Sequence, residues 1–334
     1  MRIPAARPGA RLVLQGGGAT AAVDDLAREV RRGLRSSPKR IPCRFFYDAE
    51  GSRLFEEICE LPEYYLTRAE DEILAERAGE IAELVPAGAD LVELGSGSAR
   101  KTSRLIRAML ARSGTLCYVP IDISPTALEA SSERLLECHP ALSIRGIAAE
   151  YEAGLAWLEE MPSSGRLVLL LGSNIGNFDR KGAAELLRRL GRRLAPGDRL
   201  LVGIDLRKER SVLERAYDDA RGVTARFNKN LLVRMNAELG SDFDPADFRH
   251  LAFYVEDAGR IEMHLESRRA HRVRIERLAM DVHLAAGERI HTEDSYKYSP
   301  EEIEGLARAA GLERVVSWTD RRELFSLNVL APPG

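Results

Sequence analysis

The sequence predicts an α/β fold in which a largely parallel sheet is covered by helices on both faces. Short apolar runs, each long enough for a buried strand, recur between residues 90 and 205 and alternate with segments of helical periodicity. That alternation is typical of parallel sheets, whose crossover helices bury both faces of the strands. The expected strands cover residues 91–94, 116–121, 144–148, 167–171 and 200–204.

Helical periodicity fills the intervals between these runs and returns near the end of the chain. The expected helices cover residues 102–111, 125–137, 155–160, 181–194 and 300–310. Two further strand-like runs, at 314–318 and 324–330, can complete the sheet as an antiparallel pair.

The region from about Lys208 to Tyr298 breaks this rhythm. Apolar and polar residues alternate strictly in residues 261–266, which predicts an antiparallel strand with one solvated face. We therefore expect a β-rich insertion that joins the N-terminal segment in a second, α+β domain over the sheet. The expected division is 68–207 plus 298–334 for the sheet domain and 16–67 plus 208–297 for the second domain, with 1–15 flexible.

Composition and charge exclude several classes of protein. The 334 residues carry a net charge of −3 with both signs interspersed, so neither a nucleic-acid nor a membrane surface is indicated. The four cysteines form no C-x-x-C pair, and the six histidines form no ligand pair of the H-x-x-x-H kind, so we expect no disulfide framework and no metal. The only apolar patch near the N-terminus is too short for a signal peptide or a membrane span. A cytoplasmic monomer is the expectation.

The segment D-L-V-E-L-G-S-G-S-A-R-K, residues 90–101, indicates a nucleotide-cofactor site. Gly95 and Gly97 fall at a turn from strand to helix, where glycine permits close approach of a ligand to the backbone and the helix N-terminus offers free N–H groups. Asp122 ends the next expected strand, a position from which a carboxylate can accept hydrogen bonds from ribose hydroxyls.

Two residues of this segment indicate which cofactor binds. A dinucleotide-binding fingerprint needs a third glycine at the position of Arg100, where a bulky side chain would obstruct close helix packing. Glu93 precedes the glycine turn by two positions and suits the cationic methionine end of S-adenosylmethionine. The pattern therefore favours S-adenosylmethionine over NAD, although a cofactor-binding protein without catalytic activity would share it.

Polar and aromatic residues gather in three other segments. Tyr47 and Tyr64 lie in an aromatic N-terminal region, where packing alone is a sufficient explanation. Asn174 and Asn177 follow the fourth expected strand, at the sheet edge where α/β proteins bind ligands, although asparagine is also common in turns.

Glu293 and Ser295 form the third candidate pair, within H-T-E-D-S-Y-K-Y. Two residues apart in an extended segment, their side chains face the same side. A carboxylate beside a hydroxyl can hold a heteroaromatic ring that has one N–H donor and one acceptor nitrogen, which describes imidazole. A solvated charged loop is the alternative.

These motifs together resemble the histidine-specific N-alpha-methyltransferases of ergothioneine biosynthesis. The resemblance runs in order from about Arg44 to the C-terminus and rests on F-Y-D-A-E-G-S-R-L-F-E-E-I with L-P-E-Y-Y-L-T-R-A-E, E-L-G-S-G-S-x-x-K-T, G-S-N-I-G-N, A-Y-D-D-A-R-G-V-T-A-x-F-N and H-T-E-D-S-x-K-Y.

The resemblance implies an enzyme that moves three methyl groups from S-adenosylmethionine to the α-amine of L-histidine, giving hercynine. A Rossmann-like class I methyltransferase domain would carry the cofactor, and the second domain would bind the substrate. A related enzyme acting on another aromatic or modified amino acid is the alternative, and Glu293 argues against an indole.

The resemblance and the motifs assign residues to both ligands. Tyr47 and Asn177 are expected to orient the reacting amine. The expected cofactor residues are Glu93, Gly95, Gly97, Lys101, Asp122, Glu150 and Tyr151, where Glu150 departs from the aspartate that the family often has. The expected substrate residues are Tyr47, Tyr64, Asn177, Tyr217, Thr224, Met263, Glu293 and Ser295.

Overall fold

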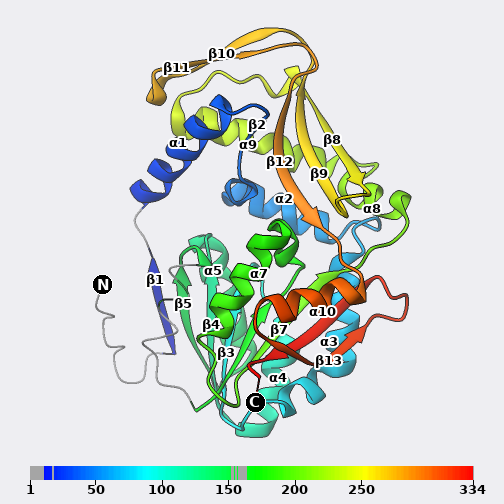
Figure 1. Cartoon of the computed structure of the whole chain (residues 1–334). Helices are drawn as coiled ribbons and strands as arrows, with labels where there is room; N and C mark the ends of the chain where they lie inside the picture. The colour runs from blue at the N-terminus through cyan, green and yellow to red at the C-terminus, as the bar shows by residue number, and fades with distance from the viewer. Residues whose placement is uncertain (1–10, 17–18, 152–153, 155, 157–163, 334) are drawn as a thin grey trace.

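The structure is a computed structural model that describes residues 11–16, 19–151, 154, 156 and 164–333. Its lower half in Figure 1 is a large twisted sheet covered by helices, and its upper half is a smaller sheet with its own helices. The chain enters the upper half twice, once near the N-terminus and once between β7 and α10.

The large sheet has eight strands, of which the first six in spatial order are parallel. The last two run antiparallel to their neighbours, as the sequence predicts for the C-terminal pair. From one edge to the other the strands are β1 (Leu12–Gly16), β5 (Leu142–Ala148), β4 (Leu116–Asp122), β3 (Asp90–Leu94), β6 (Arg166–Leu170), β7 (Arg199–Asp205), β14 (Phe325–Ala331) and β13 (Glu313–Thr319). The order of the five central parallel strands is that of a Rossmann sheet, and the predicted fold class is confirmed.

Helices cover both faces of this sheet, and side-chain caps fix where several begin. The Asp179 carboxylate accepts the Gly182 N–H at 2.7 Å, and Ser299 forms a capping box with Glu302. One face is covered by α3 (Leu66–Glu83), α4 (Thr102–Ser113) and α5 (Pro125–Cys138), and the other by α7 (Arg180–Gly191) and α10 (Pro300–Ala309).

Residues 12–15, expected to be flexible, instead form most of β1 at the edge of the large sheet. Leu12 pairs with Ile144, and the parallel register continues to the end of β5. An edge strand pairs with only one neighbour, so the three apolar residues 12–14 were enough to form it. The same three residues are too few for a signal peptide or a membrane span. The helix expected at residues 155–160 falls almost entirely outside the described residues.

The upper half combines the N-terminal segment with the insertion between β7 and α10. Its sheet has the order β2 (Lys39–Arg40), β12 (Arg289–Tyr296), β9 (Arg260–Ser267) and β8 (Phe248–Val255), and a separate hairpin joins β10 (His271–Ile275) to β11 (Met280–Leu284). The helices are α1 (Ala19–Arg35), α2 (Ala49–Cys59), α8 (Arg210–Tyr217) and α9 (Val223–Leu239). The 3-10 turns of the described chain are η1 (Cys43–Phe46), η2 (Asn174–Asn177), η3 (Pro245–Asp247) and η4 (Glu276–Leu278).

The insertion between β7 and α10 is less purely β than its sequence pattern suggested. Besides its strands it contains α8 and α9, and α9 lies beside α2 of the N-terminal segment. The alternation in residues 261–266 does form a strand, β9, with Ile261, Met263 and Leu265 buried. Its other face is only partly solvated, because the His264 ring stacks on Phe253 with 5.2 Å between centroids.

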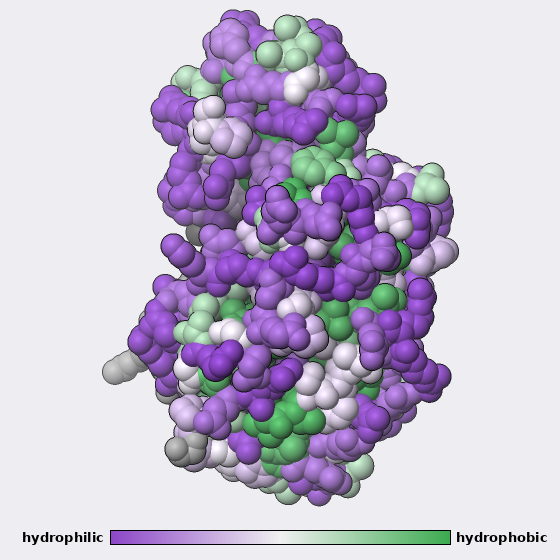
Figure 2. Space-filling view, turned by 45° about the vertical axis from the view of Figure 1, so that its right-hand side comes forward, coloured by the Kyte–Doolittle hydropathy of each residue, from purple (hydrophilic) through white to green (hydrophobic). Residues whose placement is uncertain are grey.

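The molecular surface in Figure 2 is mostly hydrophilic, with apolar residues in separate small patches on both halves. Within the described ranges, no helix combines the length and apolar character that crossing a bilayer requires.

The turn after β3 depends on glycine at Gly95. This residue has φ +72°, and its N–H donates to the Ile121 carbonyl at 2.8 Å, which holds the turn against β4. A Cβ atom at this position would lie 2.6 Å from Asn174 Nδ2 and 2.8 Å from Tyr151 Oη. Gly97 also has positive φ, +49°, but a Cβ there would meet no heavy atom within 4 Å.

We expect Gly95→Ala to lower the thermal unfolding temperature of the ligand-free protein more than Gly97→Ala does. Both alanines adopt an unfavourable positive φ, so the difference isolates the collision at residue 95, about 1–3 kcal/mol for an overpacked site. Thermal unfolding of the two variants under identical conditions measures it. Equal losses would show that Asn174 and Tyr151 move aside freely.

Candidate active site

Two adjacent cavities lie at the carboxyl edge of the parallel strands, where open α/β sheets bind ligands. The larger has a volume of about 800 Å³, within the range of small-molecule sites, and the smaller about 40 Å³. Four residues line both cavities and so form their junction: Tyr47, Phe55, Asn174 and Asn177.

The larger cavity contains most of the predicted cofactor residues. Gly95 and Gly97 border it after β3, Asp122 after β4, and Glu150 with Tyr151 after β5. These positions follow three adjacent parallel strands, so their side chains and backbone converge on one space.

Asp122 is held rigidly at the end of β4. One carboxylate oxygen accepts the Gly97 N–H at 2.8 Å and the other accepts the Ser124 N–H at 2.9 Å. Burial raises the pKa of this carboxyl above its usual range, while the backbone N–H groups oppose that rise. The lone pairs that remain can accept hydroxyl groups of a ribose, as the sequence predicts.

Glu93 and Lys101 do not line the cavity and support the glycine turn from behind. The buried Glu93 carboxylate accepts hydrogen bonds from Thr102 Oγ1 at 2.8 Å and from the Tyr118 hydroxyl, and burial raises its pKa to about 7. Lys101 pairs with the fully buried Glu70, which also accepts the Gly172 N–H at 2.8 Å. Neither Glu93 nor Lys101 lines the larger cavity, so their contact with the cofactor remains a prediction.

The smaller cavity brings together every residue that the sequence assigns to an amino-acid substrate. These residues come from both halves of the molecule and are far apart in the chain. They are Tyr47, Tyr64, Asn177, Tyr217, Thr224, Met263, Glu293 and Ser295.

A bulge in β12 gives Glu293 its position. The pairing of β12 with β9 shifts register between His291 and Glu293, so that Glu293 lies opposite Met263 and Ser295 opposite Ile261. Bulges beside binding sites change the direction of a side chain while the ladder continues on either side. Glu293 and Ser295 consequently face the same cavity.

Glu293 is a carboxylate without a hydrogen-bond partner among the described residues. Burial raises its pKa from 4.5 to about 7; the positive charge of Lys297 opposes this rise, and Asp294 adds to it. The same burial, reinforced by the charge of Glu293, raises the pKa of Tyr47 well above its usual range. At neutral pH, Tyr47 is therefore a neutral hydroxyl and not a base.

Aromatic rings form much of the wall of the small cavity. Tyr47 lies 5.6 Å from Phe55, Phe55 lies 6.2 Å from Tyr64, and Tyr64 lies 6.1 Å from Tyr217, measured between ring centroids in edge-to-face arrangements. Apolar ring surface beside the polar groups lowers the local dielectric and strengthens polar interactions inside the cavity.

Sequence reasoning missed two features of the cavity walls. Phe55 is central to both cavities, yet in the sequence it reads as an ordinary apolar position of α2. Arg44 Nε pairs with the Glu150 carboxylate at 2.8 Å across the larger cavity. Only the aromatic-rich segment that contains both residues could have indicated them.

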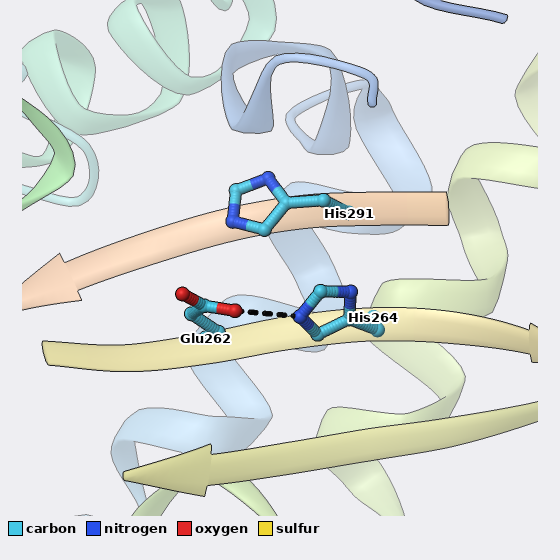
Figure 3. Close-up of side chains that lie close together, drawn as sticks. All are labelled: Glu262, His264 and His291. Atoms are coloured by element: carbon cyan, nitrogen blue, oxygen red, sulfur yellow. Dashed lines mark hydrogen bonds and ion pairs between the residues drawn. The ribbon is translucent and has the colours of Figure 1, made fainter. Parts of the chain in front are cut away.

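The sequence treats the histidines as scattered, but the fold brings two of them together on paired strands. Figure 3 shows His264 of β9 beside His291 of β12, with Glu262 bonded to His264 Nε2 at 3.0 Å. The potential ligand atoms of these three residues lie within 4.8 Å of one another. Arg260 pairs with Glu262 and, at 2.8 Å, with Asp294, so a guanidinium already balances the nearby carboxylates and we assign no metal here.

A Rossmann sheet with a cofactor-sized cavity at its carboxyl edge and a smaller pocket beside it is the arrangement of an enzyme that binds a nucleotide cofactor and a small substrate. Residues 26–332 match the family model described as histidine-specific methyltransferase, SAM-dependent. The chain therefore belongs to the family of S-adenosylmethionine-dependent histidine-specific methyltransferases.

Curated relatives resemble the chain over nearly its whole length. It is 43% identical to the histidine N-alpha-methyltransferase of Mycolicibacterium smegmatis, over 93% of this chain and 96% of the relative. It is 41% identical to the histidine N-alpha-methyltransferase of Mycobacterium tuberculosis, over 92% and 94%. It is also 34% identical to ergothioneine biosynthesis protein 1 of Neurospora crassa, over 89% of this chain and 34% of that longer protein.

We expect Glu293→Gln to stabilise the protein increasingly as pH rises from 5 to 8. The native pKa of about 7 exceeds the ordinary value of 4.5, so unfolding releases a proton between these values and the wild-type free energy of unfolding falls as pH rises. The amide has no such penalty, which reaches on the order of 2–3 kcal/mol above pH 7.

Urea unfolding of wild type and variant at several pH values measures this difference. A stability difference that stays constant with pH would mean that Glu293 ionises normally in the folded protein.

Proposed function

We propose that this protein transfers three methyl groups in succession from S-adenosylmethionine to the α-amine of L-histidine, giving hercynine for ergothioneine biosynthesis. One observation carries the proposal. Glu293, a partly buried carboxylate without a hydrogen-bond partner among the described residues, and the Ser295 hydroxyl line a pocket that shares Tyr47 and Asn177 with the cofactor cavity. The family and its relatives support the same reaction.

The pocket suits imidazole better than other aromatic rings. Neutral imidazole offers one N–H, which the Glu293 carboxylate can accept, and one bare nitrogen, to which the Ser295 hydroxyl can donate. An indole offers the N–H alone and would leave Ser295 unpaired. A site built to pair a polar group rejects analogues that lack it by roughly 10⁴-fold or more.

The larger cavity suits S-adenosylmethionine in volume and in the carboxylate at Asp122. When bound, this cofactor supplies the methyl group through its sulfonium. The protein must then hold the substrate amine, with its lone pair free, about 3–3.5 Å from the methyl carbon. Tyr47 and Asn177, at the junction of the cavities, are the residues that we assign to this positioning.

Each transfer requires a deprotonated amine. An α-amine with a pKa near 8 is only about a tenth deprotonated at pH 7, so a proton must leave before the first transfer, and the amine must lose another after each of the first two. The raised pKa of Tyr47 makes it a hydrogen-bond partner that orients the nitrogen and relays protons towards solvent, without itself ionising.

Mass spectrometry tests the function directly. The purified protein is incubated with S-adenosylmethionine and each of the twenty amino acids separately. We expect histidine alone to gain one, two and finally three methyl groups. Efficient methylation of tryptophan would contradict the proposal. So would a histidine product that stops at one methyl group when S-adenosylmethionine is in excess over histidine.

We expect Glu293→Ala to raise the KM for histidine at least tenfold while changing the KM for S-adenosylmethionine less than twofold, because a hydrogen bond to a charged group contributes roughly 1.5–3 kcal/mol. Steady-state kinetics with each substrate varied in turn measure both constants. Asp294→Ala is the matched control, since the Asp294 carboxylate on the same strand pairs with Arg260 and His291 and does not line either cavity. Equal effects of Glu293→Ala on both constants would refute the imidazole assignment.

A further inference from the structure

We propose that Lys297 is a positioning residue that determines which pocket groups donate hydrogen bonds. By donating to both pocket hydroxyls, it leaves one hydroxyl proton available for an acceptor nitrogen of the substrate ring. Lys297 does not line the pocket, but its ammonium group contacts both pocket hydroxyls, Tyr217 and Ser295. This role rests on the proposed function: Lys297 would make the pocket select a ring that has a hydrogen-bond-accepting nitrogen.

Lys297 is fully buried and remains charged. Its Nζ lies 2.7 Å from Oδ2 of Asp205, and both side chains are 0% exposed. Burial alone would lower the pKa of this lysine, but the carboxylate of Asp205 more than compensates and the net shift is upward. The pocket therefore has a permanent positive charge behind its hydroxyls.

The ammonium group has three protons and three acceptors. Besides Asp205, Nζ donates to Tyr217 Oη at 2.8 Å and to Ser295 Oγ at 2.8 Å. An ammonium group cannot accept a hydrogen bond, so the direction of these bonds is not in question. Each hydroxyl oxygen receives one proton from Lys297 and keeps its own proton for another partner.

The two hydroxyls also bond to each other, with 2.8 Å between Tyr217 Oη and Ser295 Oγ. That bond uses one of the two hydroxyl protons, which leaves a single proton to donate into the pocket. When Tyr217 donates to Ser295, the Ser295 oxygen accepts two bonds and its own proton is the free one. Ser295 shares a strand face with Glu293, so the free proton is beside the carboxylate that accepts.

With Tyr217 as the donor to Ser295, the pocket presents one acceptor, Glu293, and one donor, Ser295. This pair complements neutral imidazole, with its one N–H and one bare nitrogen. The charge of Lys297 behind the hydroxyls strengthens the donor and disfavours a second N–H at that position. Without Lys297, each hydroxyl oxygen would have a lone pair free to accept a ring N–H, and the preference for an acceptor nitrogen would weaken.

Lys208 provides a matched control. Its Nζ also pairs with Asp205, at 2.5 Å from Oδ1, and bonds to the Tyr65 hydroxyl at 2.7 Å. Its side chain is 8% exposed, so it is a second largely buried ammonium on the same carboxylate. Its hydrogen bonds go to groups outside the substrate pocket.

The experiment compares Lys297→Met with Lys208→Met. For each protein, kcat and KM are measured with histidine and with the 2- and 3-pyrrolyl analogues, which keep a ring N–H but replace the acceptor nitrogen with C–H. We expect Lys297→Met to reduce kcat/KM for histidine tenfold or more, mainly through KM, and to change kcat/KM for the better analogue less than threefold. The ratio of the two substrates should therefore fall at least threefold, whereas Lys208→Met should leave it within twofold of wild type.

Other outcomes overturn the inference. An unchanged ratio in Lys297→Met, or an equal fall in Lys208→Met, would show that the ion pair has only a structural role. If Lys297→Met no longer binds S-adenosylhomocysteine in calorimetry, Lys297→Gln gives the same comparison without the charge, and an unchanged ratio there also overturns the inference. A wild-type protein that fails to methylate histidine would overturn the proposed function itself, and the inference with it.

Discussion

The buried ion pair between Asp205 and Lys297 joins the two parts of the catalytic apparatus. Asp205 ends β7 of the large sheet, and Lys297 directly follows β12, the strand that carries Glu293 and Ser295. Removing one partner of such a pair leaves an uncompensated buried charge, which typically costs about 3–5 kcal/mol. The pair therefore fixes β12 relative to the carboxyl edge of the large sheet, where the larger cavity lies. The shared wall of the two cavities depends on that register.

The same region also contains a group that the fold does not satisfy. Glu293 is partly buried with no hydrogen-bond partner among the described residues, and this desolvation raises the pKa of its carboxyl to about 7. Glu93 has a similarly raised pKa and is more deeply buried, but it differs because Thr102 and Tyr118 donate to it. Glu93 is therefore a structural carboxylate, whereas Glu293 has the surroundings of a carboxylate whose hydrogen-bond partner is a ligand. We propose that this ligand is the imidazole of histidine, because the chain belongs to a histidine-specific methyltransferase family and Ser295 places a hydroxyl beside the carboxylate.

Local patterns predicted what depends on neighbours in the chain. The glycine turn follows from a strand, two glycines and a helix in succession, and the common orientation of Glu293 and Ser295 follows from their spacing in a strand. Contacts between distant segments were not predictable in this way. The edge strand β1 depends on pairing with β5, and the approach of His264 to His291 depends on the register of β9 with β12. The role of Lys297 could not be predicted from the sequence for the same reason, because its partner Asp205 lies 92 positions earlier in the chain (297 − 205 = 92).

A crystal structure of the protein with S-adenosylhomocysteine and histidine tests the central claim most directly. We predict that the imidazole ring lies between Glu293 and Ser295, and that the α-amine, beside Tyr47 and Asn177, points towards the cofactor sulfur. Hydrogen-bond distances of about 2.7–3.2 Å from the ring nitrogens to Glu293 and Ser295 would support it. An imidazole ring bound elsewhere, or an amine facing away from the larger cavity, would contradict it.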